Sequence, residues 1–222
     1  MVEKLKTGTT TVGLKLEDSV ILAADMRASL GHLAYEEEAE KLYKITKRIG
    51  VTNAGSVGDS LTIIRFLRSQ AKLYEINRED QMTCKAASTL LSNILNANRF
   101  YPFICQLVIG GLDHHKPALF EVAPDGSVLE RKRYAVSGSG TVLALTTLDN
   151  EYTEDMSKDE GIALAVKAIQ AAKKRDIYSG GKSVKVMIID MAGNRFIPDE
   201  EVDKHVKKLS EPKVSAKAVS KK

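Results

Sequence analysis

The sequence contains no tryptophan, and aromatic residues supply only 5% of it. Proteins that bind single-stranded nucleic acid stack the bases on aromatic side chains. A base-stacking surface is therefore not expected.

Cysteine and histidine are also scarce. Cys84 and Cys105 lie in apolar stretches without metal-binding or redox spacing and are interpreted as core residues, and the four histidines form no HExxH-like pattern. The sequence predicts no metal site.

Long apolar runs are missing as well. A membrane-spanning helix needs a run of about 18 or more apolar residues, and the chain has none. The first eight residues, MVEKLKTG, also lack the apolar region of a secretory signal peptide. We expect a cytoplasmic protein that makes no membrane contact.

Acidic residues are nearly absent from the C-terminal end. Residues 204–222 are rich in lysine and include one acid, Glu211, whereas the net charge of the whole chain is only +4. Such a segment is typical of a disordered terminus, and binding to nucleic acid is the alternative. Deleting residues 210–222 and measuring salt-dependent binding would separate the two readings.

What is present indicates one globular domain. The chain has 222 residues, 43% hydrophobic and 28% charged, enough for one full-sized domain or at most two small ones. Alternation over 10–17 and short apolar or strand-like runs elsewhere predict strands over 10–17, 20–24, 42–45, 49–54, 105–110, 117–122, 134–136 and 184–190. Helices are predicted from 57 to beyond 74, after a Thr83 cap, after Gly140, over 158–174 and over 199–209. The first helix is expected to bury Val57, Leu61, Ile64, Ala71 and Tyr74.

The order of these elements is strands, two helices, strands, two helices and strands, which is not the strict alternation of a parallel sheet. It favours an α+β protein with antiparallel sheets and helices on their outer faces.

Two phosphate-binding patterns are weak. Gly180-Gly181-Lys182-Ser183 resembles the end of a P-loop, but Asp176 replaces the required glycine and a strand follows. Ser137-Gly138-Ser139-Gly140 is a common turn before a helix.

Thr9-Thr10-Thr11 begins the first predicted strand, and threonine is favoured in strands for structural reasons alone. The wider pattern is more specific. In order along the chain, the motifs are GTTTVG, AADMR, the lysine of EKLYKI, AGSVGD, LLSNILN, QLVIGGLD, SGSG, DEG and AKKRDIYSGG. This ordered set resembles β-subunits of the proteasome core particle, of the archaeal kind, over residues 8–209.

The resemblance implies the N-terminal-nucleophile hydrolase fold, a four-layer αββα sandwich of two antiparallel sheets between helix layers. It also implies three segments: a propeptide over 1–8, removed by autocatalysis at Gly8-Thr9; a catalytic domain over 9–209; and a disordered basic tail over 210–222. Because Gly8 has no side chain, a strained turn that lets Thr9 attack the preceding carbonyl is accessible.

The resemblance assigns the chemistry residue by residue. The free amine of Thr9 takes the proton of its own hydroxyl, Lys41 keeps that amine neutral, and Asp25 holds Lys41. Gly55 presents its N–H to the oxyanion, and Arg27 supports the charge network. Ser139, Asp176 and Ser179 orient the amine. The residues assigned to the substrate pocket are Ala28, Ala39, Tyr43, Asn53 and Val57, of which Asn53 departs from the usual aliphatic residue.

The implied protein is a threonine endopeptidase of broad specificity that needs no metal or other cofactor. Its partners are α-subunits and other β-subunits in four stacked seven-membered rings, and an ATP-driven unfoldase that supplies unfolded proteins through the α-rings. Two alternatives stay open: a structural β-subunit that never processes, although such subunits lack the catalytic Thr or Lys; and a subunit that needs a second β-type for activation.

Overall fold

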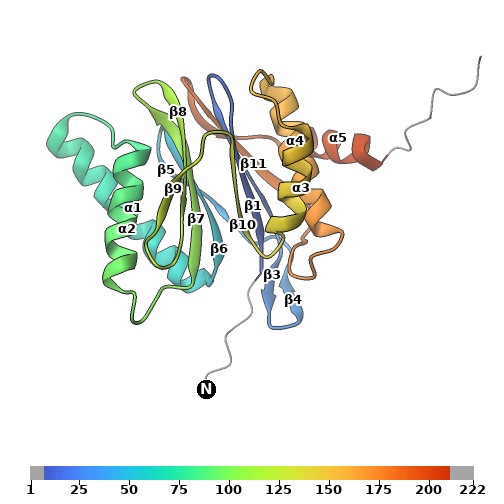
Figure 1. Cartoon of the computed structure of the whole chain (residues 1–222), viewed down its shortest axis with the longest axis horizontal. Coiled ribbons are helices and arrows are strands. Elements are labelled where there is room, and N and C mark those ends of the chain that lie inside the picture. Colours follow the sequence, from blue (N-terminus) through green and yellow to red (C-terminus); the bar gives the residue numbers. More distant parts are fainter. Residues whose placement is uncertain (1–7, 211–222) are drawn as a thin grey trace, which may run out of the picture.

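The computed structural model describes residues 8–210, which form two five-stranded antiparallel sheets and five helices (Figure 1). The first sheet contains, in spatial order, β10 (Tyr134–Gly138), β1 (Thr10–Lys15), β2 (Val20–Asp25), β11 (Val184–Asp190) and β12 (Gly193–Phe196). The second contains β5 (Leu42–Thr46), β6 (Ile49–Gly55), β7 (Cys105–Asp113), β8 (Lys116–Val122) and β9 (Val128–Glu130). A separate hairpin pairs β3 (Ala28–Leu30) with β4 (Leu33–Glu36).

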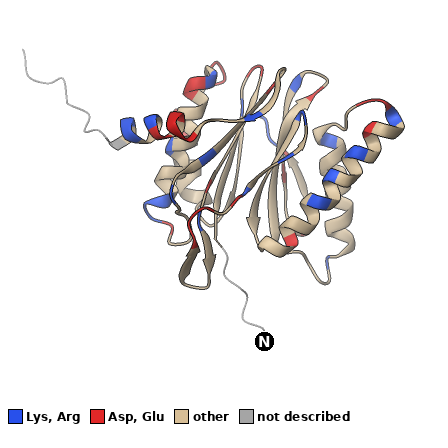
Figure 2. Cartoon of the chain, turned by 180° about the vertical axis from the view of Figure 1, so that it is seen from behind, with Lys and Arg blue, Asp and Glu red and all other residues tan. Residues whose placement is uncertain are grey.

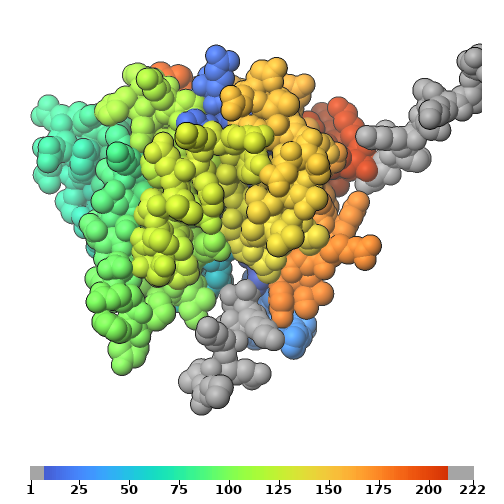
Figure 3. All heavy atoms as spheres, in the orientation of Figure 1, coloured from blue at the N-terminus to red at the C-terminus, as the bar shows by residue number. Residues whose placement is uncertain are grey.

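The helices cover the outer faces of the two sheets. The second sheet packs against α1 (Val57–Arg78) and α2 (Cys84–Ala97), and the first against α3 (Thr141–Glu151), α4 (Lys158–Lys173) and α5 (Asp199–Ser210). Figure 1 shows the two helix layers at opposite sides of the paired sheets. In Figure 3 the yellow-green segment that includes β9 and β10 fills the surface between these layers. The expected four-layer αββα sandwich is confirmed.

The alternation of side chains in β2 explains the layers. Ile21 and Ala23 belong to the cluster under α4, whereas Val20, Leu22 and Ala24 belong to the cluster between the sheets. A strand that is apolar on both faces must lie between two apolar layers, because successive side chains point to opposite faces. The result is three stacked apolar clusters, of which the middle one joins the sheets.

Glycines let the two sheets approach in this middle layer. A Cβ on Gly13 would lie 2.7 Å from Leu119 Cδ1, and one on Gly110 would lie 2.6 Å from Val20 Cγ1. No side chain fits at these distances without a shift of its neighbours. The close approach brings β6, and the segment that leads into β5, near the start of β1.

Most predicted elements are confirmed, including the Thr83 cap, whose side chain accepts a hydrogen bond from the Ala86 amide. The strand predicted over 10–17 is too long, because the Leu16 amide donates to the Ser19 carbonyl and closes the turn. The sequence did not reveal β3, β4 or β9. These strands have three or four residues each, and none of their residues is buried, so no apolar alternation marks them.

The predicted buried face of α1 is partly wrong. Val57 is 56% exposed and Leu61 is 36% exposed, while the buried residues are Ser60, Ile63, Ile64, Leu67 and Ala71. Ile64 and Ala71 are buried as predicted, and Ser60, on the same buried face, donates a hydrogen bond to Asn53 of β6.

Figure 2 shows acidic residues at the start of α5 and basic residues near its end, as the helix dipole favours. The basic tail predicted over 210–222 lies almost wholly outside the described residues, as does most of the leader over 1–8.

Residues of the middle cluster should contribute strongly to stability. Leu22 is fully buried between the sheets, so Leu22→Ala should lower the free energy of unfolding by about 2–5 kcal/mol. Leu30→Ala is the matched control, because Leu30 is 52% exposed and its truncation should cost less than about 0.5 kcal/mol. Urea denaturation followed by circular dichroism measures both. Equal losses in the two variants would contradict this account of the core.

Candidate active site

The carboxylate of Asp25 is the centre of the candidate site. Asp25 ends β2, and its side chain is fully buried. One oxygen accepts from Lys41 Nζ at 2.7 Å and from the Thr10 amide at 2.9 Å. The other accepts from the amides of Gly180 at 2.8 Å and Arg27 at 3.3 Å. Four donors from separate segments thus stabilise a charge that burial alone would exclude.

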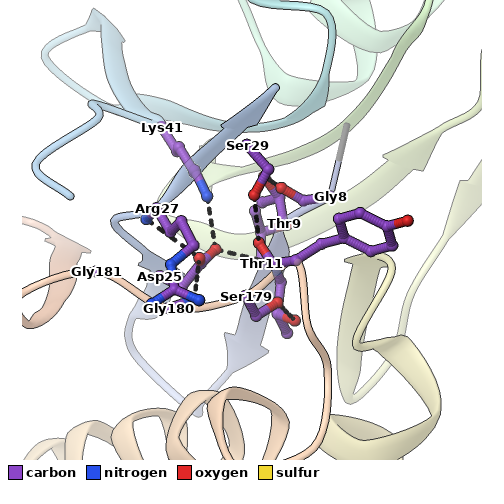
Figure 4. Close-up of polar contacts among 12 residues, drawn as sticks. Gly8, Thr9, Thr11, Asp25, Arg27, Ser29, Lys41, Ser179, Gly180 and Gly181 are labelled. Carbon is purple, nitrogen blue, oxygen red and sulfur yellow. Dashed lines mark hydrogen bonds and ion pairs between the residues drawn. The ribbon is translucent and has the colours of Figure 1, made fainter. Parts of the chain in front are cut away.

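Lys41 directly precedes β5 and reaches from the second sheet to Asp25 in the first (Figure 4). Its side chain is only 6% exposed. Burial lowers the pKa of Lys41 below its ordinary value, and the neighbouring Asp25 carboxylate opposes that shift. The Lys41 ammonium therefore lies in a water-poor environment, where its charge acts strongly on nearby groups.

Thr9 lies next to this ion pair at the start of β1 and is 5% exposed. Its hydroxyl donates to the carbonyl oxygen of Gly8 at 2.7 Å. The Gly8–Thr9 peptide bond is intact, so Thr9 N is an amide, and it donates to Ser139 Oγ at 3.2 Å. The nucleophile predicted from the sequence thus touches the carbonyl group that it is predicted to attack.

A second carboxylate lies beyond Ser139. Asp176 Oδ2 accepts from Ser139 Oγ at 2.5 Å and from Ser179 Oγ at 2.6 Å. Because a carboxylate only accepts, both hydroxyl protons point to Asp176. Ser179 must then accept at its 2.6 Å contact with the Thr10 hydroxyl. The three residues that the resemblance assigns to the amine are therefore joined in one network, which reaches Thr9 N through Ser139.

A small cavity of about 40 Å³ adjoins Thr9. It includes four of the predicted pocket residues, and its lining is Gly8, Thr9, Ala28, Ser29, Ala39, Glu40, Lys41, Asn53, Gly55 and Val57. The fifth, Tyr43, lies outside this lining, and its hydroxyl donates to the Glu40 carbonyl at 2.6 Å. Asn53 Oδ1 lies 2.5 Å from Ser60 Oγ. The side chain of Asn53 is therefore held by α1.

Gly55 and Arg27 each have a structural role that does not depend on catalysis. Gly55 has φ +136°, and a Cβ on it would lie 2.2 Å from the Ile104 carbonyl oxygen, so no other residue fits there. Its role toward an oxyanion stays a prediction. Arg27 contacts Asp25 only through its backbone amide, and its side chain pairs with Glu37 at 3.1 Å.

Several residues of the site were not found from the sequence. Lys173, in the last turn of α4, donates from Nζ to the carbonyls of Gly181 at 2.9 Å and Ser183 at 3.2 Å. It thereby supports the loop whose Gly180 amide binds Asp25. Thr10 and Tyr178 were also missed. Backbone donors and clamping lysines carry no sequence signal, although Gly180 and Tyr178 lie within the AKKRDIYSGG motif.

Over residues 8–210, no three or more His, Cys, Asp or Glu residues form a group able to hold a metal ion. In the same part of the chain, no helix is both long and apolar enough to cross a membrane.

Comparison with known proteins identifies the family. The family model for proteasome subunits matches residues 5–189. A proteasome subunit beta of Methanocaldococcus fervens is 45% identical over 204 residues, which cover 91% of this chain and 91% of that protein. A proteasome subunit beta of Methanosarcina mazei is 41% identical over 198 residues, 89% of this chain and 94% of that protein. A proteasome subunit beta of Methanococcus vannielii is 43% identical over 207 residues, which cover 93% of this chain and 94% of that protein. The chain therefore belongs to the proteasome subunit family.

Proposed function

We propose that this chain is a threonine-type endopeptidase, the catalytic β-subunit of a proteasome core particle, and that Thr9 is its nucleophile. The observation that carries the proposal is the 2.7 Å contact between the Thr9 hydroxyl and the Gly8 carbonyl, beside the buried Lys41–Asp25 pair. A non-processing structural subunit would not need this arrangement.

Self-cleavage is the first step of the proposed function. The Thr9 hydroxyl oxygen attacks the Gly8 carbonyl carbon, the Gly8–Thr9 C–N bond breaks, and the hydroxyl proton passes to the released amine. Water then hydrolyses the ester and releases residues 1–8. The mature domain begins at Thr9 and continues to about residue 209.

The released amine then serves as the general base. An α-amine has an ordinary pKa of about 8, close to the working pH, so it can take the proton of the hydroxyl on the same residue. The neighbouring Lys41 cation disfavours a second positive charge at Thr9 and keeps the amine neutral. The bond from Thr9 N to Ser139 directs the nitrogen, and Asp176 holds Ser139 in turn.

The proposed assembly follows the family. We infer four stacked seven-membered rings with α-subunits outside and β-subunits inside, an ATP-driven unfoldase that delivers unfolded proteins, and a cytoplasmic location. The hydrolysis proposed here uses no metal or organic cofactor, because the amine and hydroxyl of Thr9 supply both base and nucleophile.

Replacing Thr9 should block processing. A Thr9→Ala chain lacks the attacking hydroxyl and should keep residues 1–8 after assembly with α-subunits. Thr89→Ala, on the exposed face of α2, is the matched control and should lose them. Intact mass measurement of the assembled subunit distinguishes the two. Loss of the leader from Thr9→Ala rings without added protease would refute self-cleavage.

Lys41 can be tested apart from processing. A leaderless Lys41→Ala subunit, with Thr9 freed by another route, should lose peptide hydrolysis by at least about 100-fold, as removal of proton-transfer assistance does. Lys41→Arg keeps the charge but should not restore the rate, because a guanidinium differs in shape and proton affinity.

Lys44→Ala is the matched control, since the Lys44 side chain is exposed and contacts the Asn194 carbonyl and the Phe196 ring, away from Thr9. Circular dichroism should show that all three variants fold. Near-normal hydrolysis by Lys41→Ala rings would remove Lys41 from the mechanism.

The cavity predicts cleavage after bulky apolar residues. Gly8 lines it, so removal of the leader should enlarge it, and Ala28, Ala39 and Val57 offer apolar walls. Burial of a Leu or Phe side chain there would contribute about 1.5–3 kcal/mol. Asn53 should admit polar side chains as well, and Asn53→Leu should narrow the profile to apolar ones. Product sequencing from a denatured protein provides the measurement. A leading preference for acidic residues would contradict the assignment.

A further inference from the structure

Gly8 lies directly against Tyr178. A Cβ on Gly8 would lie 1.8 Å from Tyr178 Cβ, 2.5 Å from Tyr178 Cγ and 2.8 Å from Ser139 Oγ. Real Cβ atoms do not approach other heavy atoms within 3.0 Å, so something must shift. The Ser139 hydroxyl can rotate away, but Tyr178 Cβ is attached to the backbone and no side-chain rotation moves it.

The backbone of Tyr178 is held on several sides. Its amide donates to Asp176 Oδ1 at 3.3 Å, and its carbonyl accepts from Ser29 Oγ at 3.5 Å. The next two residues are fixed as well, Ser179 by Asp176 and Gly180 by the Asp25 carboxylate. A shift of Tyr178 that made room for a side chain at position 8 would therefore disturb the donors of Asp25.

We propose that Tyr178 restricts position 8 to glycine and thereby holds the scissile carbonyl against the Thr9 hydroxyl. This inference rests on the proposed self-cleavage and makes Tyr178 a positioning residue for it. Any larger residue at position 8 would move its carbonyl away from the attacking oxygen. A Cβ on residue 8 would point to Tyr178. The residue allowed at position 8 therefore depends on Tyr178, whereas the substrate side chains allowed depend on the lining of the separate cavity beside Thr9.

The chemistry is that of the proposed self-cleavage. The bond between Thr9 Oγ and the Gly8 carbonyl carbon forms, the C–N bond breaks, and the hydroxyl proton goes to the released amine; water then cleaves the ester. Tyr178 takes no part in proton transfer. Its effect is steric, so it should depend on the atoms present at positions 8 and 178 together.

The test compares processing rates of four chains assembled with α-subunits, followed by intact mass. Gly8→Ala should process about 100-fold more slowly than the unmodified chain, the loss expected when a reacting group moves by about 1 Å. Gly8→Ala/Tyr178→Gly removes the clashing Cβ and should process at least about tenfold faster than Gly8→Ala alone, within the coupling range of residues in contact.

Tyr178→Ala is the matched control, because alanine keeps the Cβ at 1.8 Å and so Gly8→Ala/Tyr178→Ala should stay slow. A role of the ring, or general loosening of the loop, would instead give equal recovery with either substitution at 178. That result, or a double variant with Tyr178→Gly as slow as Gly8→Ala, overturns the proposal.

Should the glycine double variant fail to fold by circular dichroism, Gly8→Ala still tests the restriction at position 8, because processing close to the unmodified rate overturns the proposal. Failure of the proposed self-cleavage can be told apart from failure of the Tyr178 proposal. If self-cleavage is wrong, the unmodified chain keeps residues 1–8 after assembly, or the Thr9→Ala chain loses them.

Discussion

The burial of the Asp25 carboxylate is the constraint on which the site depends. A charge with no access to water is tolerated only when donors surround it, and removal of one partner from a buried ion pair costs about 3–5 kcal/mol. Here the donors come from the start of β1, the segment after β2, the segment before β5 and the loop before β11. Satisfying one carboxylate therefore fixes four segments relative to one another, including the strand that carries Thr9.

The sandwich makes this convergence possible. The sheets approach closely because glycines occupy the middle layer, and Lys41 can then reach Asp25 from the opposite sheet. The nucleophile, the ion pair and the Asp176 network consequently lie at the end of the sheets where β1 begins and β2 ends. Fold and site share the same contacts, so a change that separates the sheets should also separate Lys41 from Thr9.

Patterning predicted the long elements well, because apolar periodicity reports burial directly. In α4, whose range was predicted, the apolar residues at helical spacing are all buried: Ile162, Ala165, Val166, Ile169 and Ala172. Patterning failed where burial is weak or where a polar residue belongs to the buried face. The β3–β4 hairpin buries no residue, and the buried face of α1 includes the polar Ser60, which apolar spacing does not mark.

The sequence by itself determined the types of the main elements, the resemblance to proteasome β-subunits and the candidate residues Thr9, Asp25 and Lys41, because these are encoded in local patterns and ordered motifs. Only the tertiary structure decided which groups surround them. The Gly180 amide that binds Asp25 lies 155 positions away along the chain. Backbone donors, the clamp formed by Lys173 and the wall that Tyr178 presents to Gly8 depend on distances and Cβ directions, and these exist only once distant segments are packed together.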